Sequence, residues 1–201
     1  FNKIKQIDSI TWEKIENVRK KYDWVCASPV ETSIGLKVPI NELKLLKKRC
    51  SANLMLDATG SIGLEDGHNN AEVATFSSCK GLFGLTGGSF ISYKVKPNYY
   101  KNSFYLNIYN HEFKKMTGPY HTICSLYHVL KNYKKIRQSV LNNKKIFLSK
   151  MKKNLIFPKK NQPKLCTYVN KKMKGKSKKI VLYESRAKIS GSVVNHLGEL
   201  H

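Results

Sequence analysis

The sequence contains the stretch Ser77-Ser78-Cys79-Lys80-Gly81-Leu82-Phe83-Gly84-Leu85-Thr86-Gly87-Gly88, in which one lysine lies between small polar residues and four glycines. A short apolar segment ending at Phe76 precedes it, and the strand-like segment 89–93 follows it. Most other lysines lie in runs or beside other charges, whereas Lys80 does not. Such a lysine either binds phosphate as a point charge or is a nucleophilic amine partly stripped of water, with a lowered pKa. We favour the nucleophile.

The segments around this loop predict an α/β fold. Aromatic, β-branched or apolar runs predict strands over residues 22–30, 53–58, 73–76 and 88–95, with the last one returning antiparallel. Apolar spacing predicts an amphipathic helix over 4–20, a helix opened by Pro39, and a long helix with a buried apolar stripe from Gly118-Pro119 to about residue 150. Residues 96–118 are predicted to be irregular.

The last fifty residues differ from the rest of the chain. Short strand-like runs at 155–158, 165–169, 180–183 and 189–194 alternate with lysine-rich turns. We therefore expect two domains: a large α/β domain over residues 1–150, and a small α+β domain over residues 151–201.

Composition narrows the functional classes. The net charge is +24, but only four of the 37 basic residues are arginines, and no nucleic-acid-binding motif is present. We interpret the lysines as solvated surface and regard a basic nucleic-acid-binding module as the least favoured alternative. No apolar run approaches the roughly 20 residues that cross a bilayer, and no signal peptide is evident. The histidines show no metal-ligand spacing, so no metal site is predicted.

Two further features concern the state of the chain. The five cysteines are odd in number, with no Cys-x-x-Cys pair, which favours free thiols in a reducing cytoplasm. The sequence begins with Phe1, and we expect a fragment or a processed chain whose upstream part lies outside the sequence.

Three polar positions follow successive predicted strands: Glu31-Thr32-Ser33, Asp57, and Ser78 with Lys80. In an open α/β sheet, the carboxyl ends of the strands converge on one crevice. A pyridoxal cofactor needs an amine, an acid near its ring nitrogen, hydrogen bonds to its ring oxygen and donors for its phosphate. Simpler interpretations remain open: a surface lysine at position 80, a turn-forming or capping aspartate at 57, and turn hydroxyls at 32 and 33.

The order of these motifs resembles that of the class V aminotransferases, which are fold type I pyridoxal-phosphate enzymes. The resemblance rests on Glu31-Thr32-Ser33-Ile34-Gly35, Leu56-Asp57-Ala58, Ser77-Ser78-Cys79-Lys80-Gly81, and Thr117-Gly118-Pro119-Tyr120-His121. It covers about residues 20–135 well and the tail weakly. Within the family, it is greatest to the aminotransferases of 2-aminoethylphosphonate and pyruvate. The implied fold is a mixed, mostly parallel sheet with helices on both faces and a small C-terminal α+β domain.

The resemblance also implies a role for individual residues. Lys80 matches the Schiff-base lysine, Asp57 the acid paired with the pyridine nitrogen, and Thr32 the hydroxyl near the cofactor ring oxygen. Thr59 falls where the family packs a residue beneath the ring, and Ser78 is expected to help place the phosphate or the lysine.

Two further matches concern the partner subunit and the substrate. Thr117 matches a residue that reaches the phosphate of the partner subunit's cofactor, which implies a homodimer. Arg186 is the nearest counterpart of the substrate-binding arginine, with Lys188 as a substitute. Cys79 departs from the family, which often has Asn or Gln there, and the family's phosphate loop would lie before Phe1.

The expected function is therefore a cytoplasmic, pyridoxal 5′-phosphate-dependent transamination between a small amine, plausibly 2-aminoethylphosphonate, and an oxo-acid such as pyruvate. Two alternatives remain beside the nucleic-acid module. One is another class V enzyme, such as a lyase or a desulfurase. The other is a truncated, inactive piece of a transaminase.

Overall fold

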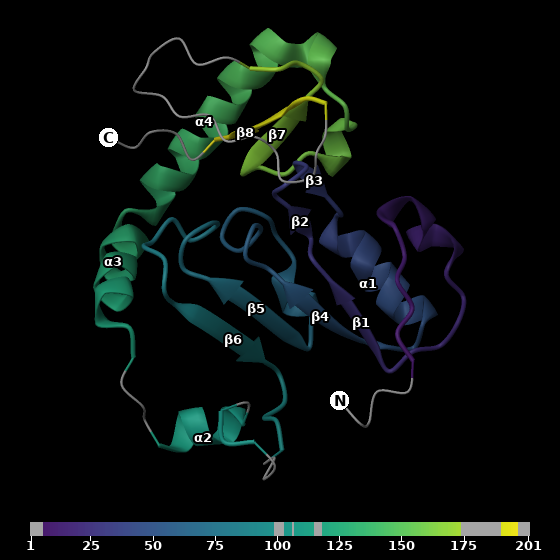
Figure 1. Ribbon diagram of the computed structural model, residues 1–201, viewed down its shortest axis with the longest axis vertical. Helices are drawn as coiled ribbons and strands as arrows, with labels where there is room; N and C mark the ends of the chain where they lie inside the picture. The colour runs from purple at the N-terminus through teal and green to yellow at the C-terminus, as the bar shows by residue number, and fades with distance from the viewer. Residues whose placement is uncertain (1–5, 99–102, 106, 115–117, 174–189, 197–201) are drawn as a thin grey trace.

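The computed structural model describes residues 6–98, 103–105, 107–114, 118–173 and 190–196 (Figure 1). Its centre is a four-stranded sheet in the order β1-β4-β5-β6. The strands are β1 (Trp24–Ala27), β4 (Asn53–Asp57), β5 (Val73–Ser77) and β6 (Ser89–Tyr93). β1, β4 and β5 are parallel, whereas β6 returns antiparallel to β5. The predicted strands and the predicted antiparallel return are confirmed.

Helix α1 (Ile40–Arg49) packs one face of the sheet and forms the main core with it. It begins directly after Pro39, as predicted, and its last turn carries basic residues that suit the helix dipole. Its buried residues Leu43 and Leu46 lie in one cluster with Leu54 and Leu56 of β4, which are fully buried. This core fixes where β4 ends and therefore where Asp57 lies.

The opposite face of the sheet carries the alternate residues of the same strands. Trp24 on β1 is 43% exposed, Ile91 on β6 is 48% exposed, and Cys26 and Asp57 are also exposed. The sequence predicts helices on both faces of this sheet. Among the described residues, these side chains on the second face remain accessible to solvent.

A small hairpin projects beyond the carboxyl end of β1. It consists of β2 (Val30–Glu31) and β3 (Leu36–Lys37), which pair antiparallel around a turn that contains Thr32. Gly35 in this turn has φ +61°, and a Cβ atom there would lie 2.8 Å from the backbone nitrogen of Tyr168. A glycine is therefore needed both for the turn and for the close approach of the hairpin to the C-terminal strands.

The long helix predicted from Pro119 to about residue 150 is wrong as a single element. The structure has α3 (Tyr120–Lys131) and α4 (Tyr133–Met151), which are separated by Asn132 at φ −103° and ψ 9°. The Asn132 side chain donates to the His128 carbonyl at 3.1 Å and so competes with the helical hydrogen bonds. The predicted buried stripe is also only partly observed: Leu126 and Val140 are buried, whereas Ile123, Tyr127, Leu130 and Ile146 are 54–57% exposed.

Two further predictions near the surface are wrong. The helix expected over 4–20 is, among its described residues, a single 3₁₀ turn, η1 (Trp12–Asn17), with Ile15 buried in the core. Ile7 and Ile10 are exposed and do not pack as a helix face. The region 96–118, predicted to be irregular, contains α2 (Ile108–Phe113), which begins where the Asn107 side chain accepts from the Tyr109 backbone.

The C-terminal strands β7 (Cys166–Val169) and β8 (Ser192–Asn195) pair antiparallel, beside α4 (Figure 1). They confirm the strands predicted at 165–169 and 189–194. The run 155–158 is not a strand, because only Leu155 forms an isolated bridge, to Val169. The run 180–183 lies outside the described residues. Short 3₁₀ turns complete the fold: η2 (His68–Asn70), η3 (Lys152–Asn154) and η4 (Lys159–Asn161). The boundary at residue 150 stays a prediction.

Candidate active site

Lys80 and Thr32 meet at the carboxyl end of the parallel strands. The ammonium group of Lys80 donates to the hydroxyl oxygen of Thr32 at 2.9 Å, across 48 residues of sequence. Thr32 is half-buried, but Lys80 is exposed. The sequence predicted that the Lys80 amine is partly desolvated, but it is exposed because its loop lies at the surface. The predicted proximity of Lys80 and Thr32 is observed.

Asp57 is the last residue of β4 and is also exposed. Its carboxylate accepts from the backbone N–H of Thr59 at 3.0 Å. The carbonyl of Thr59 in turn accepts from the backbone N–H of Gly81 at 3.1 Å. One backbone hydrogen bond, from Gly81 to Thr59, thus connects the loop that follows Asp57 to the loop that carries Lys80, and the bond to the Asp57 carboxylate lies within the first of these loops.

Glycines allow these three segments to lie against one another. A Cβ atom on Gly81 would lie 2.3 Å from the carbonyl oxygen of Ile62, which is a severe clash with backbone. A Cβ atom on Gly60 would lie 3.0 Å from the Thr32 methyl group. The Lys80 loop, the Asp57 loop and the Thr32 hairpin are therefore in contact, with little room for side chains between them.

Ser78 is buried beneath this surface. Its hydroxyl donates to the Leu85 carbonyl at 2.5 Å and accepts from the Gly88 backbone N–H at 3.2 Å. The Ser78 backbone also bonds to Gly88 and Gly84. The observed role of Ser78 is to brace the glycine-rich loop, and a direct contact of Ser78 with a cofactor stays a prediction.

Other residues that hold the Lys80 loop were not found by sequence reasoning. The Tyr133 hydroxyl at the start of α4 donates to the Gly81 carbonyl at 3.3 Å, and its ring stacks on Phe83. Burial raises the pKa of Tyr133. From α3, Thr122 donates to the Thr86 carbonyl, and Ser125 accepts from the Leu85 backbone N–H at 3.0 Å.

The sequence near the Lys80 loop could not predict these contacts, because the contacting residues lie 36 to 52 positions after the loop residues that they bind. Phe83 itself has φ +61°, an uncommon conformation for a residue with a side chain. Thr117, Arg186 and Lys188 lie outside the described residues. Cys79 contacts the Ser77 hydroxyl through its sulfur at 3.3 Å.

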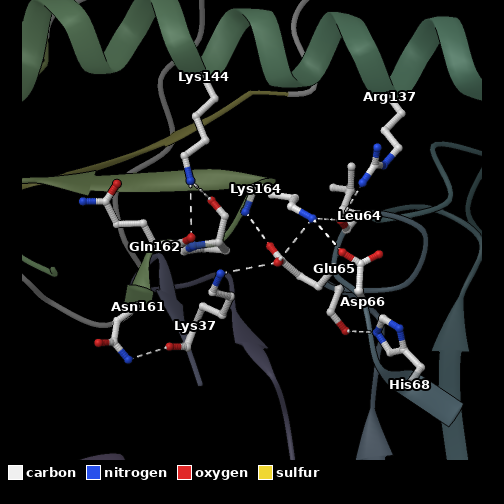
Figure 2. Close-up of polar contacts among 12 residues, drawn as sticks. Lys37, Leu64, Glu65, Asp66, His68, Arg137, Lys144, Asn161, Gln162 and Lys164 are labelled. Carbon is white, nitrogen blue, oxygen red and sulfur yellow. Dashed lines mark hydrogen bonds and ion pairs between the residues drawn. The ribbon is translucent and has the colours of Figure 1, made fainter. Parts of the chain in front are cut away.

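A second polar cluster joins the Asp57 loop to the C-terminal part of the chain (Figure 2). The buried carboxylate of Glu65 accepts from the Lys164 backbone N–H at 2.7 Å and pairs with the Lys37 ammonium group at 3.4 Å. The Leu64 carbonyl accepts from the Lys164 side chain at 2.6 Å and from Arg137 at 3.4 Å. The hairpin, α4 and the segment before β7 are therefore all attached to residues 64 and 65.

Lys144 of α4 completes this cluster by donating to the Pro163 carbonyl at 2.6 Å and the Gln162 carbonyl at 3.3 Å (Figure 2). Burial lowers the pKa of Lys144 to about 8. His68 contacts the buried Ser61 hydroxyl at 2.8 Å within the loop, and burial also lowers the pKa of His68. Among the described residues, no group of three or more His, Cys, Asp or Glu side chains could hold a metal ion.

Comparison with known proteins identifies the fold of this chain. No family model and no curated protein matches the chain. Among solved structures, it is similar to pyridoxamine–pyruvate aminotransferase from Mesorhizobium loti, with a TM-score of 0.63 and 18% identity, covering 81% of this chain and 49% of that one. Phosphoserine aminotransferase from Cytophaga hutchinsonii gives a TM-score of 0.61 and 17% identity, covering 78% and 51%. The chain has the fold of these aminotransferases.

The same fold also occurs in a cysteine desulfurase from Thermococcus onnurineus, with a TM-score of 0.58 and 16% identity, covering 80% of this chain and 47% of that one. The predicted fold class, an α/β fold of the type I aminotransferases with a mostly parallel sheet, is confirmed. The chain spans about half the length of the solved structures that it matches.

Proposed function

We propose that this chain forms part of a pyridoxal-phosphate-dependent aminotransferase that moves an amino group from a small amine to an oxo-acid. The observation that carries the proposal is the contact of Lys80 with Thr32, in a loop that is hydrogen-bonded to the loop after Asp57. The aminotransferase fold supports it, and the carboxyl ends of β4 and β5 are where such α/β folds bind ligands.

The residues present fit this cofactor. Lys80 offers an exposed primary amine, and Asp57 offers an exposed carboxylate at the end of the neighbouring strand. Lys80 would hold the cofactor aldehyde, Asp57 its pyridine nitrogen, Thr32 its ring oxygen, and Thr59 would pack against its ring. The bound cofactor supplies an electron sink that stabilises negative charge on the carbon next to the amino group.

The chain's own groups then have separate tasks. The Asp57 carboxylate would hold a proton on the pyridine nitrogen of the cofactor. The Lys80 amine would accept a proton from the substrate carbon and return it at a different atom. The Thr32 hydroxyl accepts a hydrogen bond from Lys80 and so limits the positions that the amine can occupy. Tyr133, Thr122 and Ser125 hold the loop in place through its backbone.

The finer assignment rests on the sequence. The resemblance names 2-aminoethylphosphonate as the amine and pyruvate as the oxo-acid, with substrate binding by Arg186 and a homodimer in which Thr117 reaches the partner's cofactor. The free cysteines favour the cytoplasm, and the change of pattern in the last fifty residues favours a division into residues 1–150 and 151–201. Since a cysteine desulfurase shares the fold, another class V reaction is the second candidate. Among the described residues, no helix is long and apolar enough to cross a membrane.

Chemical trapping tests the role of Lys80 directly. The protein is incubated with pyridoxal phosphate, reduced with borohydride and digested, and the peptides are analysed by mass spectrometry. We expect the phosphopyridoxyl group on Lys80, and no modified peptide from the Lys80→Arg variant. Modification of a different lysine, or of none, contradicts the assignment.

A half-reaction separates the substrates. The protein loaded with cofactor is mixed with 2-aminoethylphosphonate, alanine or serine, and the change in its absorption spectrum is followed. A change that is fastest with 2-aminoethylphosphonate supports the finer assignment. Release of sulfide from cysteine would instead favour the desulfurase alternative.

A further inference from the structure

The positive charge of this protein is concentrated in one part of the chain. Residues 113–183 contain 20 Lys and Arg residues and no Asp or Glu. Residues 1–112 contain 15 basic and 11 acidic residues. A lysine-rich composition of the whole chain would not explain why carboxylates are missing from one stretch of 71 residues. Such asymmetry between parts of a chain is typical of proteins that bind a polyanion.

Five of these lysines lie on one side of α4 and its extension η3. Lys134, Lys135 and Lys145 are exposed, and Lys152 and Lys153 continue the same side in η3. At 100° per residue these positions face in one direction, together with the exposed polar residues Gln138, Asn142 and Ser149. We call these eight residues the lysine stripe. From Lys134 to Lys152 it extends about 27 Å at 1.5 Å per residue.

The basic residues on the inner side of α4 form hydrogen bonds within the protein. Arg137 and Lys144 point from α4 towards the buried cluster, where they donate to backbone carbonyls (Figure 2). Val140 between them is fully buried. The basic residues of α4 are thus divided into two sets. One set stabilises the fold. Among the described residues, the side chains of the lysine stripe form hydrogen bonds only within α4, where Gln138 donates to Asn142 at 3.0 Å and Ser149 donates to the Ile146 carbonyl at 2.8 Å.

The lysine stripe also lacks partners of opposite charge. Within the described ranges, none of its five lysines forms an ion pair. By contrast, Lys47 on α1 pairs with Glu72. Five unpaired ammonium groups on one side of a helix repel one another, and this repulsion is relieved when an anion with many charges binds.

The chemistry of the stripe favours a phosphodiester backbone over a lipid surface. Lysine, asparagine, glutamine and serine are the side chains that contact nucleic-acid phosphates. The near absence of arginine disfavours base readout. A helix that binds a membrane inserts a broad apolar face, whereas the lysine stripe consists only of polar residues, and Ile146 is the one exposed apolar residue among the described residues of α4.

We propose that the lysine stripe of α4 and η3 is a binding surface for the phosphate backbone of nucleic acid, without sequence preference. This activity is separate from the Lys80 site. Because duplex DNA carries one phosphate charge per roughly 1.7 Å of its axis, a stripe of this length faces many phosphates at once. Counterions released from those phosphates make the binding strongly dependent on salt.

Fluorescence anisotropy with a labelled 20-base-pair DNA duplex and a labelled 20-nucleotide RNA tests the proposal on the full chain. The variant carries Lys134→Glu, Lys145→Glu and Lys152→Glu. The control carries Lys14→Glu, Lys44→Glu and Lys48→Glu, which are exposed residues near the N-terminus and on α1, and has the same net charge. Circular dichroism verifies folding. If the first variant does not fold, Gln replaces Glu at the three positions of both variants, so that their net charges stay equal.

We expect the stripe variant to lose at least about tenfold in affinity at 0.1 M salt, and its plot of log affinity against log salt to become less steep by about 2 to 3. The control is expected to lose much less. An equal loss in both variants would show that only net charge matters and would overturn the proposal. Equal or tighter binding of the unmodified protein to phosphatidylserine vesicles would also overturn it, in favour of a membrane surface.

Discussion

At the scale of single residues, the contact between Lys80 and Thr32 is the part of the candidate site that can be tested most sharply. We expect Thr32→Val to weaken the binding of pyridoxal phosphate roughly fivefold, because the hydrogen bond that the Thr32 hydroxyl would make to the cofactor ring oxygen, worth about 1 kcal/mol, is lost. Thr32→Ser keeps the hydroxyl and should bind almost as the unmodified protein does. Spectroscopic titration with the cofactor measures both. Equal weakening by Val and Ser would mean that the Thr32 methyl group matters rather than its hydrogen bond.

The residues of the site differ in how well sequence could predict them. Lys80, Asp57 and Thr32 each follow a recognisable strand or turn, and the general geometry of α/β sheets brings such positions together. The exposure of Lys80 could not be predicted, because it depends on how far its loop projects from the sheet. Tyr133 was missed because it is the first residue of α4, and the sequence did not predict that a helix begins there.

At the scale of elements, Glu65 connects the Asp57 loop to the hairpin and to the segment before β7. We expect Glu65→Gln to reduce the free energy of unfolding by about 2 kcal/mol, because Lys37 and Lys164 then lose a buried counter-charge. The matched control is Asp66→Asn, which also removes an ion pair with Lys164 but at a side chain that is 90% exposed. The control should change stability by less than about 0.5 kcal/mol. Urea unfolding measures both variants, and similar losses would contradict the importance of burial.

His196 at the end of β8 makes the stability of the C-terminal strands dependent on pH. It is buried, contacts the Thr167 hydroxyl at 2.8 Å and lies against Phe147. Burial, and then the charge of Lys144, lower its pKa from 6.5 to about 4. Between these values, the unfolded chain binds a proton that the folded chain does not, so stability falls as pH decreases from 6.5 to 4.

The full loss corresponds to about 3 kcal/mol at roughly 1.4 kcal/mol per pKa unit. Urea unfolding at pH 7, 5.5 and 4 measures it. The His196→Gln variant lacks this titration, while the carboxylates titrate in both proteins. The difference between the two plots of unfolding free energy against pH therefore isolates the contribution of His196. Identical slopes of the two plots between pH 6.5 and 4 would contradict the prediction.

The elements themselves were predicted well where one short segment decides them. The strands β4 and β5 are short apolar runs that end at Asp57 and at the glycine-rich loop, and α1 begins directly after Pro39. The break at Asn132 was not predicted, because apolar spacing continues across it; in the structure, the Asn132 side chain bonds to the His128 carbonyl at this break. Ile7 and Ile10 also follow a helical spacing, but both are exposed and their segment is not helical.

At the scale of the whole molecule, the fold followed from the order of strands and helices, but the solvent exposure of its surfaces did not. An amphipathic pattern shows which residues could be buried, not whether another layer covers them. The second face of the sheet illustrates this difference. Trp24, Cys26 and Ile91 have the character of a covered sheet face, yet they are accessible in the structure. Parallel sheets are normally covered on both faces, so we expect a further layer to pack on this surface.

Cysteine labelling measures whether this face is open in solution. Cys26 lies on it and is exposed, whereas Cys50 and Cys166 are buried, and burial raises the pKa of Cys166 to about 12. With a maleimide at pH 7.5, we expect Cys26 to react first and Cys50 and Cys166 to react only on unfolding, since the thiolate is the reactive form. Peptide mapping by mass spectrometry measures the labelling rate of each cysteine. Labelling in 8 M urea gives the rate for the unfolded chain, in which no cysteine is protected by burial. If Cys26 is as protected as Cys50, the face is covered in solution. If that protection disappears on dilution, the cover is a second copy of the chain, because only an association between molecules depends on concentration.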